Sequence, residues 1–148
     1  MKFKYFLTSI LATAFLNLAK AEPFDKTGLI DLKNEATKRA SCFVIGSRLE
    51  LVTTAIWSDM RGKPAKTQDE QWANEKKATE VLDFGKTGSF WAKKLNENIS
   101  QAIPPSQMQD YFTTQRDGMS KFDLLTKKDP WLGVNAWNAC GKSYGFFK

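Results

Sequence analysis

The 148-residue chain contains no histidine. This absence excludes Ser-His-Asp and Cys-His nucleophilic systems, as well as zinc sites built on imidazole. Only two cysteines, Cys42 and Cys140, are present, too few for a structural zinc site that takes four soft or imidazole ligands. Phosphate-binding GxxxxGK[ST], dinucleotide-binding GxGxxG and calcium-binding DxDxDG patterns are also missing. We therefore predict no metal, no small-molecule cofactor and no catalytic residue.

Long apolar runs are scarce beyond the first 21 residues. There, two lysines precede a mostly apolar stretch at 5–19, and small residues occupy positions 19 and 21. The stretch is shorter than the ~20 residues of a spanning helix, and it carries four polar side chains. This pattern predicts a secretory signal peptide over residues 1–21, cleaved after Ala21. No other stretch reads as apolar enough to span a bilayer, so we expect a periplasmic or secreted protein without stable membrane insertion.

Basic charge is modest once the signal peptide is set aside. The whole chain has a net charge of +6, but residues 1–21 hold three of its 22 basic residues and none of its 16 acidic ones. The remaining 19 basic and 16 acidic residues give residues 22–148 a net charge of +3. That value makes only a weak case for an anionic partner, and we predict no binding to nucleic acid. The 127 residues fit a single domain.

The two cysteines allow one pairing. Export would place Cys42 and Cys140 in an oxidising compartment, where disulfides form and persist. A bond between them would close a loop of about 100 residues, which the chain-entropy account values at ~4–5 kcal/mol. A reactive thiol at Cys140 is disfavoured because the residue lies near the predicted end of a helix, where the dipole opposes a thiolate.

Apolar residues recur at helical spacing, and no convincing β-alternation is present. We predict an all-α fold, a compact bundle of about five amphipathic helices with a disulfide between the first and the last. The first helix would begin near Thr27 and carry an apolar stripe to Met60, with Gly46 marking a close helix contact or a bend. Each later boundary is predicted from capping and stop signals: Thr67 to Gly85, Ser89 to Pro104, a helix capped by Ser106 and Gln109, and Asp129 to Gly145.

Aromatic side chains are the most distinctive feature of the composition. Trp131 and Trp137 lie six residues apart, about 120° around a helix, so one can face the core while the other faces outward. Tyr144, Phe146 and Phe147 add aromatic surface near the C-terminus. These five residues are predicted either to pack in the core or to bind a partner protein, because exposed aromatic anchors dominate binding hot spots.

Carboxylates leave one enzymatic alternative open. The order Glu50, Asp59, Thr67 resembles the acid, Asp and Thr order of phage-type lysozymes. The segment between Glu50 and Asp59 continues the helical stripe, however, where the lysozyme site has a glycine-rich hairpin. Thr67 is also explained as a helix cap. The triplet Asn98-Ile99-Ser100 matches the N-glycosylation sequon.

Three functions follow as expectations from these features. The first is a non-catalytic binding protein of the cell envelope, an inhibitor or immunity-type factor that occludes another envelope protein. The second is an accessory subunit of an envelope secretion or conjugation assembly. The third is a glycan hydrolase that uses carboxylates.

Overall fold

The computed structural model describes residues 23–147, so the predicted signal peptide lies outside the described residues. Within that part of the chain no strand is present, and Phe24 and Asp31 form one isolated β-bridge. The prediction of an all-α fold is confirmed. The elements are α1 (Glu35–Gly62), α2 (Gln68–Asn96), α3 (Ile99–Ala102), the 3₁₀ turn η1 (Pro105–Gln107), α4 (Met108–Lys128) and α5 (Trp131–Tyr144).

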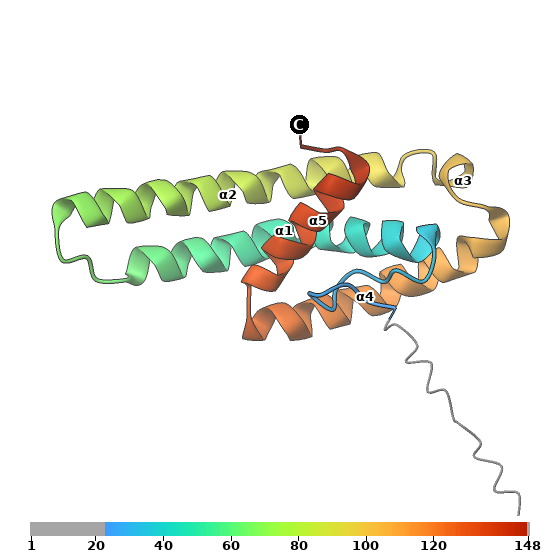
Figure 1. Ribbon diagram of the computed structural model, residues 1–148, viewed down its shortest axis with the longest axis horizontal. Coiled ribbons are helices and arrows are strands. Elements are labelled where there is room, and N and C mark those ends of the chain that lie inside the picture. The colour runs from blue at the N-terminus through green and yellow to red at the C-terminus, as the bar shows by residue number, and fades with distance from the viewer. Residues whose placement is uncertain (1–22, 148) are drawn as a thin grey trace, which may run out of the picture.

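Helix α1 is the central element of the bundle. Helices α1 and α2 form a long antiparallel hairpin, α4 lies beside the N-terminal half of α1, and α5 crosses over α1 (Figure 1). The far end of the hairpin projects beyond α4 and α5 (Figure 1). No residue from 57 to 77 is buried, so the packed core lies where the four long helices meet.

Two glycines explain why α2 is one helix. The sequence predicted a stop at Gly85 and a new helix at Ser89, but α2 runs unbroken through both positions. Gly85 and Gly88 are buried against α1, and a Cβ at Gly88 would come within 2.8 Å of the Leu49 Cβ. The prediction was wrong because these glycines allow close helix packing instead of ending a helix. Gly46 fulfils its predicted role as a close contact, since a Cβ there would lie 2.6 Å from the Trp137 ring.

The predicted start of the first helix near Thr27 was also wrong. Helix α1 begins eight residues later, where the Asn34 side chain accepts a hydrogen bond from the Thr37 backbone N–H at 2.9 Å. The preceding segment turns at Gly28, which has a φ of +72°. That left-handed conformation favours glycine and does not continue into a helix. Leu29 and Ile30 are nevertheless buried, so the segment packs onto the bundle as an irregular layer.

The predicted cap at Thr67 is confirmed, because Thr67 Oγ1 accepts the Glu70 backbone N–H at 3.1 Å. The predicted cap at Asp129 lies one residue too early, because Pro130 is the N-cap of α5 and makes no side-chain cap bond; Asp129 Oδ1 accepts the Trp131 N–H at 3.0 Å from outside the helix. The predicted cap at Ser106 was wrong, because Ser106 lies within η1 and α4 begins at Met108 without a side-chain cap. Gly145 ends α5 with a φ of +68°, as predicted.

A disulfide joins α1 to α5. Cys42 and Cys140 are bonded, their Cα atoms are 5.7 Å apart, and both residues are fully buried. The predicted bond between the first and last helices is confirmed. Such a bond is compatible with an oxidising extracellular or periplasmic compartment.

Helix α1 corrects one further expectation. It is long and apolar enough, by length and composition, to cross a membrane, although we predict no such stretch after residue 21 from the sequence. Within the bundle, 56% of its apolar window is buried. A central core helix passes the same test of length and hydropathy, and α1 occupies that position.

Candidate functional site

Trp137 is a core residue. Its side chain is 0% exposed, its ring lies against Gly46, and its indole N–H donates to Thr87 Oγ1 at 3.3 Å. A buried indole with a satisfied N–H contributes packing and is not available to a partner. Trp137 therefore does not belong to a surface that could contact a partner protein.

Tyr144 and Phe146 close the bundle at the C-terminal end of α5. The Phe146 ring stacks on Trp91 with centroids 4.8 Å apart. The Tyr144 hydroxyl donates to Glu35 at 2.9 Å. Burial raises the pKa of Tyr144, and the hydrogen bond to Glu35 adds a smaller effect in the same direction. Both side chains are half-buried, so most of this predicted surface acts as a lid on the core.

Phe147 and Trp131 remain partly accessible. The Phe147 ring lies beside Phe84, with centroids 5.6 Å apart, and 37% of the residue is exposed. Trp131 begins α5 and is 44% exposed. The predicted 120° separation of Trp131 from Trp137 thus sends one indole outward and the other into the core.

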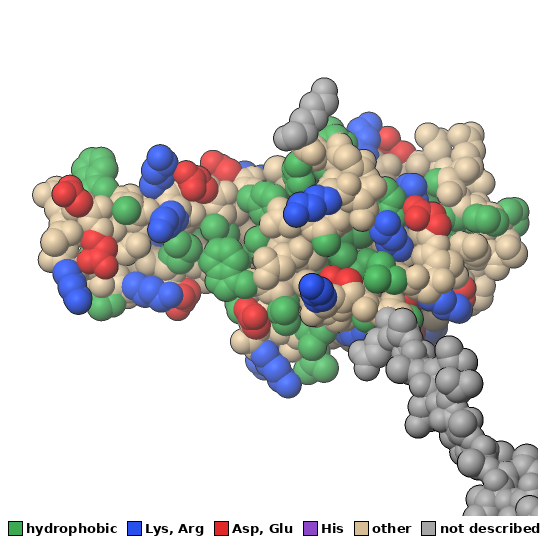
Figure 2. Space-filling view, in the orientation of Figure 1, with side chains coloured by type: hydrophobic (Ala, Val, Ile, Leu, Met, Phe, Trp, Pro, Cys, Tyr) green, Lys and Arg blue, Asp and Glu red, His purple; other side chains and the backbone are tan. Residues whose placement is uncertain are grey.

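Trp131 lines an apolar groove of about 340 Å³, which we call the α5 groove. The groove lies where α5 meets the outer part of the hairpin, a region in which Figure 2 shows hydrophobic side chains gathered at the surface. Its apolar walls come from three helices, and polar side chains share the lining. The lining residues are Met60, Lys77, Glu80, Val81, Phe84, Trp131, Val134 and Asn138.

The α5 groove has the make-up of a protein contact surface. Aromatic and aliphatic side chains form its floor, while Lys77, Glu80 and Asn138 supply polar groups. Protein interfaces commonly combine an apolar centre with a polar rim. Sequence reasoning found Trp131 but missed Met60, Val81 and Phe84, which join the site only because two other helices pack beside α5.

The carboxylates of the enzymatic alternative do not form a pair. Glu50 and Asp59 both lie on α1, nine residues apart. Nine residues advance a helix by about 13.5 Å and rotate it to the opposite side. Glycosidase carboxyls lie roughly 5–9.5 Å apart across one sugar. Asp59 instead makes an exposed ion pair with Lys63 at 3.0 Å.

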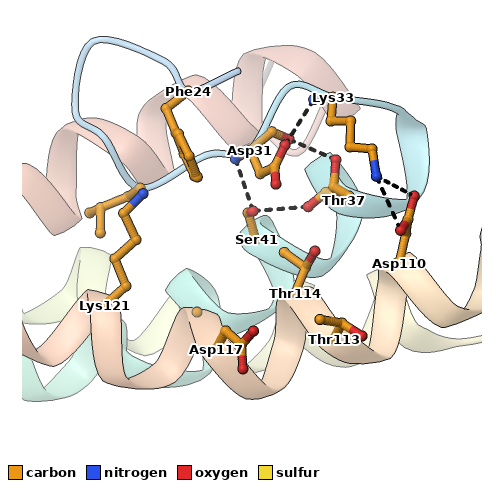
Figure 3. A pocket seen from close by; sticks show the side chains of 12 residues that line it. Phe24, Asp31, Lys33, Thr37, Ser41, Asp110, Thr113, Thr114, Asp117 and Lys121 are labelled. Atoms are coloured by element: carbon orange, nitrogen blue, oxygen red, sulfur yellow. Dashed lines mark hydrogen bonds and ion pairs between the residues drawn. The ribbon is translucent and has the colours of Figure 1, made fainter. Parts of the chain in front are cut away.

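A second hollow lies between the N-terminal segment and α4 (Figure 3). This hollow, which we call the polar cavity after the carboxylates, lysines and hydroxyls around it, measures about 290 Å³, and most of its accessible lining is apolar carbon. The residues around it are Phe24, Leu29, Asp31, Lys33, Thr37, Ser41, Asp110, Thr113, Thr114, Asp117, Gly118 and Lys121. Sequence patterns did not predict this cavity, because its two walls lie far apart along the chain.

An ion pair joins the N-terminal segment to α4 at one end of the polar cavity. Lys33 Nζ contacts Asp110 at 3.1 Å, and the Asn34 amide donates to the same carboxylate at 2.8 Å. The hydrogen bond from Lys33 lowers the pKa of Asp110, and the hydrogen bond from Asn34 adds to this effect. At the other end, the Lys121 ammonium lies over the Phe24 ring, 3.0 Å from its centroid.

Among the described residues, no group of three or more His, Cys, Asp or Glu side chains is arranged to hold a metal ion. Comparisons with protein families, with curated proteins and with solved structures found no match to this chain.

Proposed function

We propose that the protein is a non-catalytic binding protein of the cell envelope that holds another envelope protein at the α5 groove. One observation carries the proposal: Trp131, 44% exposed, stands at the edge of an apolar groove of about 340 Å³. Exposed tryptophans next to apolar pockets are the residues that most often dominate protein interfaces. The proposed signal peptide and the disulfide support a location outside the cytoplasm.

The proposed mechanism is occlusion by a rigid surface. A side chain of the partner would enter the α5 groove and pack on Trp131, while Lys77 and Glu80 would orient the partner at the polar edge. The disulfide holds α5 on α1, so the groove is formed before binding and little ordering entropy is lost. This arrangement suits an inhibitor or immunity-type factor.

A pull-down with matched tryptophan variants tests the proposal. The mature protein is used to capture partners from its own envelope fraction, and the same capture is repeated with Trp131→Ala and Trp72→Ala. Trp72 is the matched control because it is 68% exposed but does not line the groove. We expect Trp131→Ala to lose the partner, with affinity at least ~30-fold lower for a hot-spot loss of about 2 kcal/mol. Trp72→Ala should retain it.

The identity of the captured protein separates the two binding roles. A soluble hydrolase whose activity falls on binding would support an inhibitor. A membrane assembly would support the alternative, an accessory subunit of a secretion or conjugation apparatus. Capture of nothing, or equal capture by the wild type and Trp131→Ala, would refute binding at the α5 groove.

A further inference from the structure

Helix α4 turns a row of polar side chains toward the hollow beside the N-terminal segment. The face of α4 that packs on the bundle carries Tyr111 and Phe122, which are buried, as expected for an amphipathic helix. The polar row lies beside that face, where its side chains are half-buried or, at Asp117, exposed. The residues that face the polar cavity recur at steps of three or four along the same helix, and they are Asp110, Thr114, Asp117 and Lys121.

The opposite wall of the cavity is held in place by buried hydroxyls. Ser41 Oγ accepts the Asp31 backbone N–H at 3.0 Å and donates to the Thr37 carbonyl at 2.9 Å. Thr37 Oγ1 donates to the Asp31 carbonyl at 3.2 Å. Ser41 and Thr37 are 3% and 2% exposed, so the irregular segment that carries Asp31 is anchored to α1. The wall of the cavity that carries Asp31 is therefore held on α1.

The charges around the cavity leave one carboxylate without a cation. Asp110 pairs with Lys33 at 3.1 Å, and Asp117 pairs with Arg116 at 2.8 Å. The Asp31 carboxylate accepts the Lys33 backbone N–H at 2.8 Å, and no ion pair involves it within residues 23–147. Asp31 is half-buried. A partly desolvated carboxylate is stabilised by a cation within hydrogen-bond reach.

Figure 3 shows how these groups are placed around the space. Lys121 reaches from α4 toward Phe24 at one end, and Lys33 reaches Asp110 at the other. Asp31, Ser41 and Thr114 lie between the two ends. The volume of about 290 Å³ is at the lower limit of the ~300–1,000 Å³ typical of small-molecule sites. The space between the ends thus offers a carboxylate and a threonine hydroxyl to a small polar molecule.

We infer that the polar cavity binds a small molecule bearing a protonated amine, whose ammonium group pairs with Asp31. Thr114 supplies a hydroxyl for a second polar group of the ligand, and Phe24 and Leu29 cover its carbon skeleton. Small diamines and amino sugars share this chemistry. The inference is independent of partner binding at the α5 groove, which lies on other residues.

Titration of the whole protein with defined amines tests the inference. The probes are 1,4-diaminobutane and glucosamine, and their uncharged counterparts are 1,4-butanediol and glucose. Binding is followed by calorimetry and by the backbone amide NMR signals of Asp31, Thr114 and Gly118. We expect at least one amine to shift these signals and to bind at least ~10-fold more tightly than its uncharged counterpart, as a charged hydrogen bond implies. Tighter binding of glucosamine would assign an amino sugar, and tighter binding of the diamine would assign an alkyl amine.

Three variants locate the binding. Asp31→Asn removes the charge but keeps an oxygen that can accept the Lys33 N–H, so the turn is preserved; affinity should fall at least ~10-fold. Thr114→Met fills the cavity from α4 with a good helix former, and it should block both amines. Asp59→Asn is the matched control, since Asp59 is an exposed carboxylate away from the cavity, and it should bind like the wild type.

The following outcomes would overturn the inference. The first is that neither amine shifts the three amide signals at concentrations up to ~10 mM, a range that already covers weak binding. Alternatively, the uncharged counterparts bind equally well, or Asp31→Asn and Thr114→Met bind as the wild type does. Shifts confined to exposed carboxylates such as Asp59 would also overturn it, because they would show only general attraction between charges.

Discussion

Breaking the bond between Cys42 and Cys140 should remove a large part of the protein's stability. The bonded residues are 98 positions apart, and the chain-entropy account gives a loop of that length about 4.7 kcal/mol at 25 °C. Single domains have a net free energy of unfolding of about 5–15 kcal/mol. Subtracting 4.7 kcal/mol leaves the reduced protein a free energy of unfolding between roughly 0 and 10 kcal/mol.

Urea denaturation of the oxidised and reduced proteins measures this difference. With an m-value of about 2 kcal/mol/M, the loss of 4.7 kcal/mol lowers the midpoint by about 2.4 M. Tryptophan fluorescence is a direct probe, because the buried Trp137 belongs to the same core cluster as both cysteines. Both cysteines are fully buried, so reduction is done in denaturant and checked by the gain of two daltons.

The reduced wild type is the cleanest comparison because it keeps both sulfur atoms in the core. Cys42→Ala/Cys140→Ala serves as the control for the reductant, since its midpoint should not change when a thiol reagent is added. A loss below about 1 kcal/mol in the reduced wild type would refute the entropic reasoning. It would mean that the unfolded chain keeps these two segments close without the bond.

Three further predictions concern packing and titration. Gly88→Ala should destabilise the protein by about 1–3 kcal/mol, because the new methyl would collide with α1; Gly62→Ala, at a site with nothing within 4 Å, should be neutral or slightly stabilising in the same chemical denaturation assay. Trp137→Ala should cost about 3–5 kcal/mol, measured by thermal unfolding, because it empties a fully buried site. Burial raises the pKa of Tyr111 to about 12. The unfolded chain, in which tyrosine ionises near pH 10, therefore loses this proton at a lower pH than the folded protein does. The free energy of unfolding should fall by an amount on the order of 2 kcal/mol as pH rises from 10 to 12. A Tyr111→Phe variant should lack this loss, and identical pH profiles would contradict the assignment.

Local patterns were sufficient to predict much of the fold. The apolar stripe of α1, the stop at Gly145 and the opposite orientations of Trp131 and Trp137 all follow from the geometry of a single helix. The disulfide followed from having only two cysteines and a predicted export signal. The helix features depend on residues that are close in sequence, and two cysteines allow only one disulfide pairing.

The features that were missed depend on contacts between distant segments. Gly85 reads as a helix stop until α1 is known to pack against it, and then its lack of a side chain becomes the reason that the two helices approach closely. The polar cavity joins Asp31 to residues of α4 about 80 positions later in the chain. The α5 groove likewise needs Met60 and Phe84 from two other helices. Sequence periodicity describes one helix at a time, so it predicted neither hollow.

The disulfide also determines how the protein responds to a mechanical load. A pull on the two ends of the described chain, at residues 23 and 147, passes through Cys42 and Cys140, so the 98-residue span between them bears no tension while the bond is intact. A fully extended span of that length would measure roughly 330 Å. Only the short tails outside the bond lengthen under force in the oxidised protein. The α5 groove lies wholly inside the shielded span, whereas the Asp31 wall of the polar cavity belongs to the N-terminal tail. A single reduction event would release that hidden length at once.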